Sequence, residues 1–133
     1  MNYLLDTNAC ICYLNARSER VRQRLDETPS ELITVCSIVE AELFFGAAKS
    51  RSPEETLRRQ QAFLEKFRSL PFDTKSALQY GIVRAQLERG GVIIGANDLL
   101  IASICLANGL TLVTHNTREF AAVEGLLVED WEV

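Results

Sequence analysis

The chain of 133 residues is predicted to fold as an α/β domain, with a central, mainly parallel sheet that helices cover on both faces. Short apolar segments typical of buried strands alternate with longer segments of helical periodicity along the whole chain. Apolar residues make up 47% of the sequence and charged residues 24%, which suits one core of ordinary size. No linker, repeat or low-complexity segment interrupts the pattern, so we expect a single domain over residues 1–133.

The first half of the chain predicts two strand-helix units and a further helix. Its predicted elements are a strand at 2–5, a helix at 17–27, a strand at 32–35 and helices at 37–49 and 54–67. Ser37 and Glu40 have the spacing of a capping box, in which each side chain bonds to the other residue's backbone amide. Pro53 suits the first turn of the last helix. The last two helices therefore form a predicted helical hairpin.

The second half of the chain repeats the alternation of helices and strands. Its predicted elements are an extended segment at 70–72, helices at 77–89 and 97–107, and strands at 110–113 and 126–128. Asp73 or Thr74 is expected to cap the first of these helices, and Gly90-Gly91 to end it. Because strands alternate with helices throughout, the sheet is expected to be mainly parallel.

Three acidic residues, Asp6, Glu42 and Asp98, stand where the apolar pattern predicts buried side chains. Asp6 directly follows the first strand, and open α/β sheets bind ligands at the carboxyl ends of their strands. Apolar residues follow Asp98 at i+3, i+4, i+7 and i+8, which places this acid on the buried stripe of its helix. Glu42 lies one turn after Ile38 and one turn before Gly46, so its helix face is partly apolar and then bare enough for a ligand to approach.

Each of the three acids also has a simpler interpretation. Asp6 suits a helix cap, Asp98 a first-turn acid favoured by the helix dipole, and Glu42 a surface partner of Lys49 or an arginine. A parallel sheet nevertheless gathers such side chains at one edge, where clustered carboxylates repel one another unless a cation lies among them. We therefore predict a site for a hard divalent ion, Mg²⁺ or Mn²⁺, since the single histidine argues against zinc. The typical reaction of such a site is attack of water on a phosphodiester.

The composition narrows the class of protein. A net charge of −4 argues against indiscriminate nucleic-acid binding, although arginines gather at 17–24 and 51–68 and can form local basic faces. No segment approaches the roughly 18 apolar residues of a membrane span, so we expect a cytoplasmic protein without membrane association. Four cysteines lie in apolar segments and are expected to be reduced core thiols rather than metal ligands: Cys10, Cys12, Cys36 and Cys105.

Four motifs stand in order along the chain. They are Leu-Asp-Thr-Asn at 5–8, Glu42-Leu43 with Gly46, Asn-Asp-Leu-Leu-Ile-Ala at 97–102, and Thr-His-Asn-Thr-Arg-Glu-Phe at 114–120. With Val-Glu-Asp-Trp at 128–131, they resemble a PIN-domain ribonuclease of the VapC toxin family over almost the whole chain. The resemblance implies a three-layer α/β/α sandwich with a protruding helical hairpin. It also implies Mg²⁺-dependent endonuclease activity on RNA, homodimerisation and inhibition by a cognate VapB antitoxin.

By this resemblance Asp6 and Asp98 correspond to the metal-ligand acids of the family, and Glu42 to the acid that completes the site. Asn116 stands where many PIN domains carry a fourth acid. An amide oxygen brings no charge, so we expect one firmly held metal ion and a second that binds more weakly, if at all. Glu119, one helical turn further on, either compensates for this amide or faces solvent.

Three other polar residues belong to the same motifs. Thr7 and Asn8 are expected to orient Asp6 and bound water, as the outer partners of metal ligands commonly do. His115 titrates near neutrality and is open to the role of a general base, of an RNA contact or of a solvent-facing residue. The chemistry of the family that the chain resembles does not depend on a histidine at this position.

Our hypothesis is a toxin endoribonuclease in which Asp6 and Asp98 bind Mg²⁺, while Glu42 and Asn116 complete the catalytic site. The blocks at 116–120 and 129–131 most resemble the branch that cleaves initiator tRNA in its anticodon stem-loop, so tRNA is the expected substrate. One alternative is a phosphohydrolase in which Asp6 attacks phosphate itself, although Asn8 replaces the second aspartate usual in such enzymes. The other is a catalytically weakened PIN domain that only binds its antitoxin or RNA.

Overall fold

The sheet contains five strands, all parallel, in a computed structural model that describes residues 2–133. The strand order is β3-β2-β1-β4-β5, so the first strand lies at the centre. The strands are β1 (Tyr3–Leu5), β2 (Ile33–Cys36), β3 (Arg68–Leu70), β4 (Thr111–Val113) and β5 (Leu127–Glu129). The predicted mainly parallel sheet is therefore confirmed.

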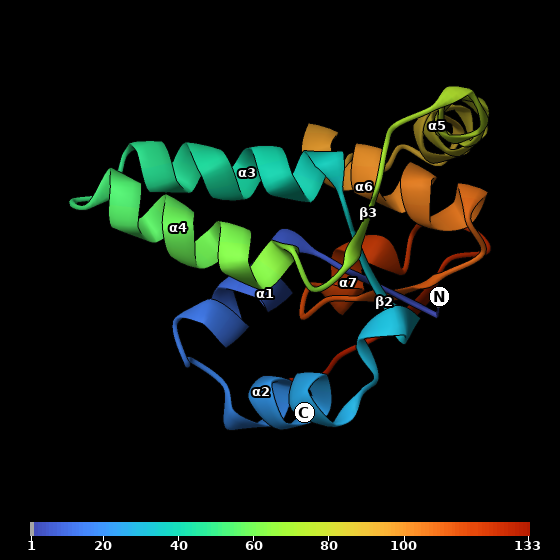
Figure 1. The fold of residues 1–133 in the computed structure, drawn as a ribbon. Helices are drawn as coiled ribbons and strands as arrows, with labels where there is room; N and C mark the ends of the chain where they lie inside the picture. Colours follow the sequence, from blue (N-terminus) through green and yellow to red (C-terminus); the bar gives the residue numbers. More distant parts are fainter. Residues whose placement is uncertain (1) are drawn as a thin grey trace.

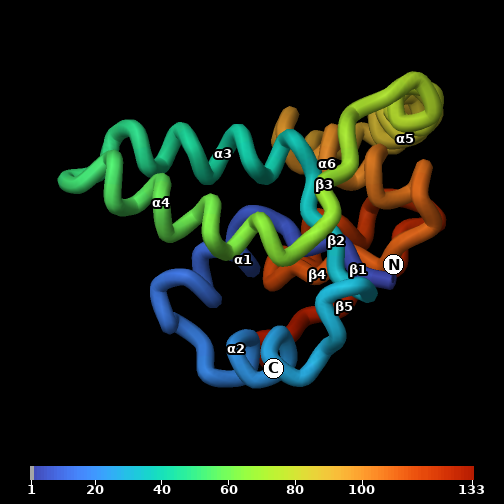
Figure 2. Tube along the Cα trace, viewed as in Figure 1, coloured from blue at the N-terminus to red at the C-terminus, as the bar shows by residue number. Residues whose placement is uncertain are grey.

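Helices cover both faces of the sheet, as predicted. They are α1 (Thr7–Leu14), α2 (Glu19–Glu27), α3 (Ser37–Ala48), α4 (Pro53–Leu64), α5 (Thr74–Arg89), α6 (Ala96–Ala107) and α7 (Thr117–Phe120), with a 3-10 turn η1 (Ser30–Leu32). Figure 1 shows α5 and α6 on one side of the sheet and α1 and α2 on the other. The predicted helical hairpin is also present, because α3 and α4 extend together beyond the sheet (Figure 2). None of these helices, in the part of the chain that the structure describes, is long and apolar enough to cross a membrane.

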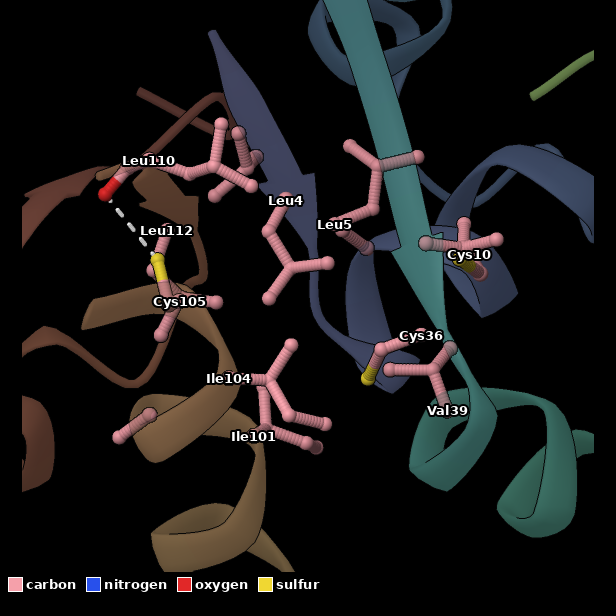
Figure 3. Packing of buried hydrophobic residues seen from close by; sticks show 14 of the residues in the cluster. Leu4, Leu5, Cys10, Cys36, Val39, Ile101, Ile104, Cys105, Leu110 and Leu112 are labelled. Atoms are coloured by element: carbon pink, nitrogen blue, oxygen red, sulfur yellow. Dashed lines mark hydrogen bonds between the residues drawn. The ribbon is translucent and has the colours of Figure 1, made fainter. Parts of the chain in front are cut away.

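The core forms where the central strand meets the helices on its two sides. Leu4 and Leu5 of β1 are fully buried, as expected of a strand in a parallel sheet that is covered on both faces. Figure 3 shows Leu4 beside Ile101 and Ile104 of α6, with Cys10 and Val39 on the other side of the strand. The thiol of Cys105 donates a hydrogen bond of 3.1 Å to the backbone oxygen of Leu110. All four cysteines are buried and none forms a disulfide within residues 2–133, so their predicted place in the core is confirmed.

Several local predictions were wrong. The chain forms α1 directly after β1, where no helix was predicted at 7–14. The capping box at α3 does not form, because Cys36 is the N-cap residue and Ser37 is already inside the helix. The Glu40 carboxylate instead accepts a hydrogen bond from the hydroxyl of Ser69 on β3. Thus a contact between distant segments replaces the local one.

The second helix of the hairpin is shorter than predicted. α4 ends at Leu64 instead of continuing to residue 67. The chain then turns so that residues 68–70 pair with β2, with Leu70 opposite Cys36. The strand therefore begins two residues before the predicted extended segment at 70–72, because pairing with β2 takes precedence over the helical periodicity of the preceding residues. α5 and α6 differ from their predicted ranges only at the first turn.

Candidate metal centre

Asp6 lies at the point where the order of the strands reverses. From β1 the chain proceeds to β2 on one side, whereas β4 lies on the other side, and such a reversal opens a crevice at the carboxyl ends of the strands. The backbone amide of Asp6 donates to the oxygen of Val113 at the end of β4, at 3.1 Å. Its carboxylate accepts a hydrogen bond of 2.8 Å from the amide of Ala9 and so caps α1. Asp6 is only 6% exposed, so it is both a helix cap and a buried acid of the crevice.

Two donors from different helices hold the Glu42 carboxylate. The hydroxyl of Thr7 on α1 donates to its Oε1, and the side-chain amide of Asn97 on α6 donates to its Oε2 at 3.2 Å. Thr7 was expected to orient Asp6, but its hydroxyl orients Glu42 instead. The alternative pairing of Glu42 with Lys49 does not occur, because the Lys49 ammonium lies over the ring of Phe45, 4.8 Å from its centroid. Glu42 therefore faces the crevice between α1, α3 and α6.

Asp98 stands in the first turn of α6, next to the carboxylate of Glu119 from α7. It is half-buried, so the prediction that it lies on the fully buried stripe was only partly correct. Glu119 accepts a hydrogen bond of 2.8 Å from the backbone amide of Gly95. A Cβ atom at Gly95 would lie 3.4 Å from Oδ2 of Asp98 and 3.7 Å from Oε1 of Glu119. The glycine thus marks the point at which the two carboxylates converge.

The segment after β4 connects Asp6 with Glu119. The buried Thr114 hydroxyl bonds to the Asp6 carboxylate and accepts a hydrogen bond of 3.0 Å from the backbone amide of Asn116. The side-chain amide of Asn116 donates to Oε2 of Glu119. Asn116 therefore positions Glu119, and Glu119 supplies the carboxylate that Asn116 lacks.

Sequence reasoning left Glu119 between two roles, compensation for Asn116 and exposure to solvent. The spacing of Glu119 favours compensation, because the third residue after Asn116 is the next one on the same face of a helix.

His115 contacts the C-terminal segment. Its Nδ1 lies 2.9 Å from Oδ2 of Asp130 and 3.6 Å from Oε2 of Glu132, so it pairs with the C-terminal segment.

The electrostatics of the crevice favour a bound cation. Burial raises the pKa of Asp6 to about 6, with further contributions from Glu42 and Glu132, whereas hydrogen bonds from Thr114 and Ala9 oppose the shift. Burial also raises the pKa of Asp98 to about 6, and the charges of Glu119, Glu42 and Asp6 add to it. A positive ion among these carboxylates would reverse both shifts.

The donors of the crevice fit a hard divalent cation. Asp6, Glu42, Asp98 and Glu119 all offer carboxylate oxygens, which Mg²⁺ and Mn²⁺ prefer over the nitrogen and sulphur ligands of softer metals. Within residues 2–133, three metal-ligating side chains come within 4.8 Å of one another only at His115, Asp130 and Glu132. The four acids of the crevice are spaced more widely than this group. We refer to these four carboxylates below as the acid cluster.

The chain is similar to known proteins over almost its whole length. Residues 3–126 match the PIN domain family. The chain is 38% identical to Ribonuclease VapC2 of Rickettsia felis over 133 residues, which covers 99% of each chain. It is 37% identical to the tRNA(fMet)-specific endonuclease VapC of Salmonella typhimurium, with 98% of each chain covered. The crystal structure of DNA-bound VapBC from Salmonella typhimurium contains a chain that superposes with a TM-score of 0.93, at 37% identity and 98% coverage of both.

Proposed function

This chain belongs to the VapC family of PIN-domain proteins, and from that premise we propose that it is a metal-dependent endoribonuclease toxin. The observation that carries the proposal is the acid cluster, in which side chains from four separate segments converge at the carboxyl ends of β1 and β4. Stability alone does not explain this arrangement, because the raised pKa values of Asp6 and Asp98 show that their charges oppose folding without a cation. We also propose that residues 1–133 act as one PIN domain.

The proposed roles of the residues follow from their partners. Asp6 and Asp98 are the proposed metal ligands, since burial and the neighbouring carboxylates raise the pKa of both, and a positive charge nearby would relieve this. Glu42 completes the site, and its two donors, Thr7 and Asn97, hold its oxygens in fixed positions. Each carboxylate is thus oriented before substrate arrives, which reduces the reorganisation needed during the reaction.

The fourth side of the site is formed by a pair of residues. Asn116 donates to Glu119 and thereby fixes the carboxylate nearest to Asp98. We propose that this pair takes the place of the fourth acid found in many PIN domains. Asp6 and Asp98 would hold Mg²⁺, or Mn²⁺ in its place, and the ion would supply the positive charge needed to activate water and to stabilise the phosphodiester during cleavage. The Thr114 hydroxyl bonds to both Asp6 and Asn116. It therefore holds the two parts of the acid cluster in fixed positions relative to each other.

Substrate and partner are proposed from the relatives. One relative is named a tRNA(fMet)-specific endonuclease, and we propose the anticodon stem-loop of initiator tRNA as the substrate of this chain. A structural relative forms a VapBC complex, and we propose that a cognate VapB antitoxin inhibits this chain. Homodimerisation and a cytoplasmic location remain predictions.

The proposal is tested with the purified, antitoxin-free protein. Cleavage of a synthetic initiator-tRNA stem-loop is followed in EDTA, Mg²⁺ and Mn²⁺, with an elongator-tRNA stem-loop as the comparison. We expect cleavage only with a metal ion and preferentially of the initiator stem-loop. Asp98→Asn should abolish cleavage while the protein remains folded. The matched control is Asp26→Asn, which removes an exposed acid on α2 that accepts a hydrogen bond from Tyr13.

The outcomes distinguish the proposed function from its alternatives. Absence of nuclease activity with every metal would support a binding module. Retention of full activity in Asp98→Asn would contradict the assigned metal site. Cleavage of both stem-loops at equal rates would leave the endoribonuclease in place but exclude initiator-tRNA specificity.

A further inference from the structure

A groove of about 390 Å³ opens beside the acid cluster, between α1, α3 and α4. Glu42 belongs to both, so the groove continues directly from the acid cluster along the helical hairpin. Its volume falls within the range of small-molecule sites. None of the roles proposed above uses this groove.

One wall of the groove is apolar and unusually open. Ile11, Leu14 and Leu43 contribute side chains to it. Gly46 lies one turn beyond Glu42 on α3, and a Cβ atom placed there would have no atom within 4 Å. Helix α3 therefore presents bare backbone to the groove, so a flat ring can approach the helix surface closely.

Two arginines belong to the lining of the groove, Arg17 and Arg59. The Arg59 guanidinium donates to the backbone oxygen of Leu14 at 2.5 Å, which fixes its position. The Glu42 carboxylate is the one acidic group that residues 2–133 contribute to the lining, so the groove is less acidic than the acid cluster that it adjoins. Guanidinium groups are well suited to binding the oxygens of a phosphate.

Gln60 joins the two helices of the hairpin beside the groove. It is 7% exposed, and its side-chain amide donates to the backbone oxygen of Leu43 at 2.9 Å. Its Oε1 atom makes no hydrogen bond within residues 2–133, but it is buried and therefore not open to a ligand in the groove. Gln60 thus holds Leu43 in place in the wall of the groove.

We propose that this groove binds one nucleotide of the RNA substrate, next to the phosphodiester that the acid cluster cleaves. The base lies against Leu43 and the bare backbone of Gly46. Its phosphate is neutralised by Arg17 and Arg59. This inference rests on the proposed endoribonuclease function and adds the position of a neighbouring nucleotide.

The test fills the groove without disturbing the fold. Gly46→Leu places a side chain in the groove. Gly81→Leu is the matched control, because Gly81 is also in a helix and a Cβ atom there would have no atom within 4 Å. Gly81 lies on α5, away from the groove. Both variants and the unsubstituted protein are compared by melting temperature, KM and kcat on the RNA stem-loop with Mg²⁺. We expect Gly46→Leu to raise KM at least about tenfold, as loss of about 1.4 kcal/mol of nucleotide binding produces. Its kcat, its melting temperature and all values for Gly81→Leu should be retained.

A second measurement tests the phosphate contact. The slope of log KM against log salt concentration should fall by about 0.7 in Arg17→Gln, the value for one phosphate contact to a single strand. Arg89→Gln, in the last turn of α5, serves as its control and should leave the slope unchanged.

The results separate the two proposals. If the unsubstituted protein cleaves no RNA with any metal, the endoribonuclease function fails, and this inference fails with it. If it cleaves RNA but Gly46→Leu has an unchanged KM, only the nucleotide site is overturned. Weaker binding of the antitoxin by Gly46→Leu, together with an unchanged KM for RNA, would instead assign the groove to the protein partner.

Discussion

Replacement of Asp6 by asparagine should stabilise the metal-free protein and remove its response to Mg²⁺. The substitution removes the charge but keeps an oxygen that can cap α1, since asparagine and aspartate are equally good N-cap residues. The buried carboxyl has its pKa raised from 3.8 to about 6, so the folded state binds a proton more readily than the unfolded state. The free energy of unfolding therefore falls as the pH rises from about 4 to about 6, and the loss persists above that range.

The size of the effect follows from this shift in pKa. Each pKa unit corresponds to about 1.4 kcal/mol, so the ionised Asp6 costs up to about 3 kcal/mol at pH 7 without metal. Asp6→Asn should recover most of this cost and raise the melting temperature by on the order of 10 °C in EDTA. At pH 4 the difference should disappear, because the unsubstituted side chain is then protonated in the folded state.

Thermal and urea unfolding of both proteins at pH 4 and pH 7.5, in EDTA and in Mg²⁺, measures each of these expectations. Asp73→Asn is the control, because Asp73 caps α5 through the amide of Ser76 but is only partly buried, and its hydrogen bonds with Ser76 lower its pKa. This control should give no stabilisation. If Asp6→Asn is less stable than the unsubstituted protein at pH 7.5 in EDTA, the idea that charge at this position opposes folding is wrong.

Three further predictions concern the acid cluster and the C-terminal segment. Glu119→Gln should lower the pKa of Asp98 towards its ordinary value, because the substitution removes a neighbouring negative charge. An NMR titration of the Asp98 carboxyl carbon measures this pKa, and an unchanged value would contradict the proximity of Glu119 and Asp98. The affinity for Mg²⁺, measured by calorimetry, should fall as the pH drops below about 6, since Asp6 and Asp98 then bind protons; a constant affinity from pH 5 to 7.5 would exclude them as ligands. Trp131→Ala should cost about 3–5 kcal/mol in urea unfolding, because the buried ring packs edge-on against Tyr3; a loss below about 1 kcal/mol would refute this.

Asp6 could be predicted from the sequence because its position depends on local rules. An acid directly after a short apolar strand lies at the carboxyl end of that strand, whatever the rest of the chain does. Asp98 and Glu42 were found by helical periodicity, which places a residue on a face but does not give its depth. For that reason Asp98 was assigned too much burial, and Thr7 was assigned to the wrong carboxylate.

The contacts that sequence reasoning missed depend on packing between distant segments. Nothing local indicates that the amide of Gly95 meets Glu119, since this contact requires α6 and α7 to lie together at the end of β4. The spacing of Ser37 and Glu40 suits a capping box, but Glu40 instead accepts a hydrogen bond from Ser69 on β3. The helix at 7–14 is short and apolar, so its periodicity is weak and its start depends on the cap that Asp6 provides.

The central position of β1 has a consequence for the order in which the site can form. β1 pairs on one side with β2, but its partner on the other side is distant in sequence, since Tyr3 lies opposite Thr111 of β4. Until that distant pairing is made, Asp6 lacks the wall of the crevice that carries Thr114, Asn116 and Glu119. The acid cluster is therefore complete only when the central strand has met its more distant neighbour along the chain.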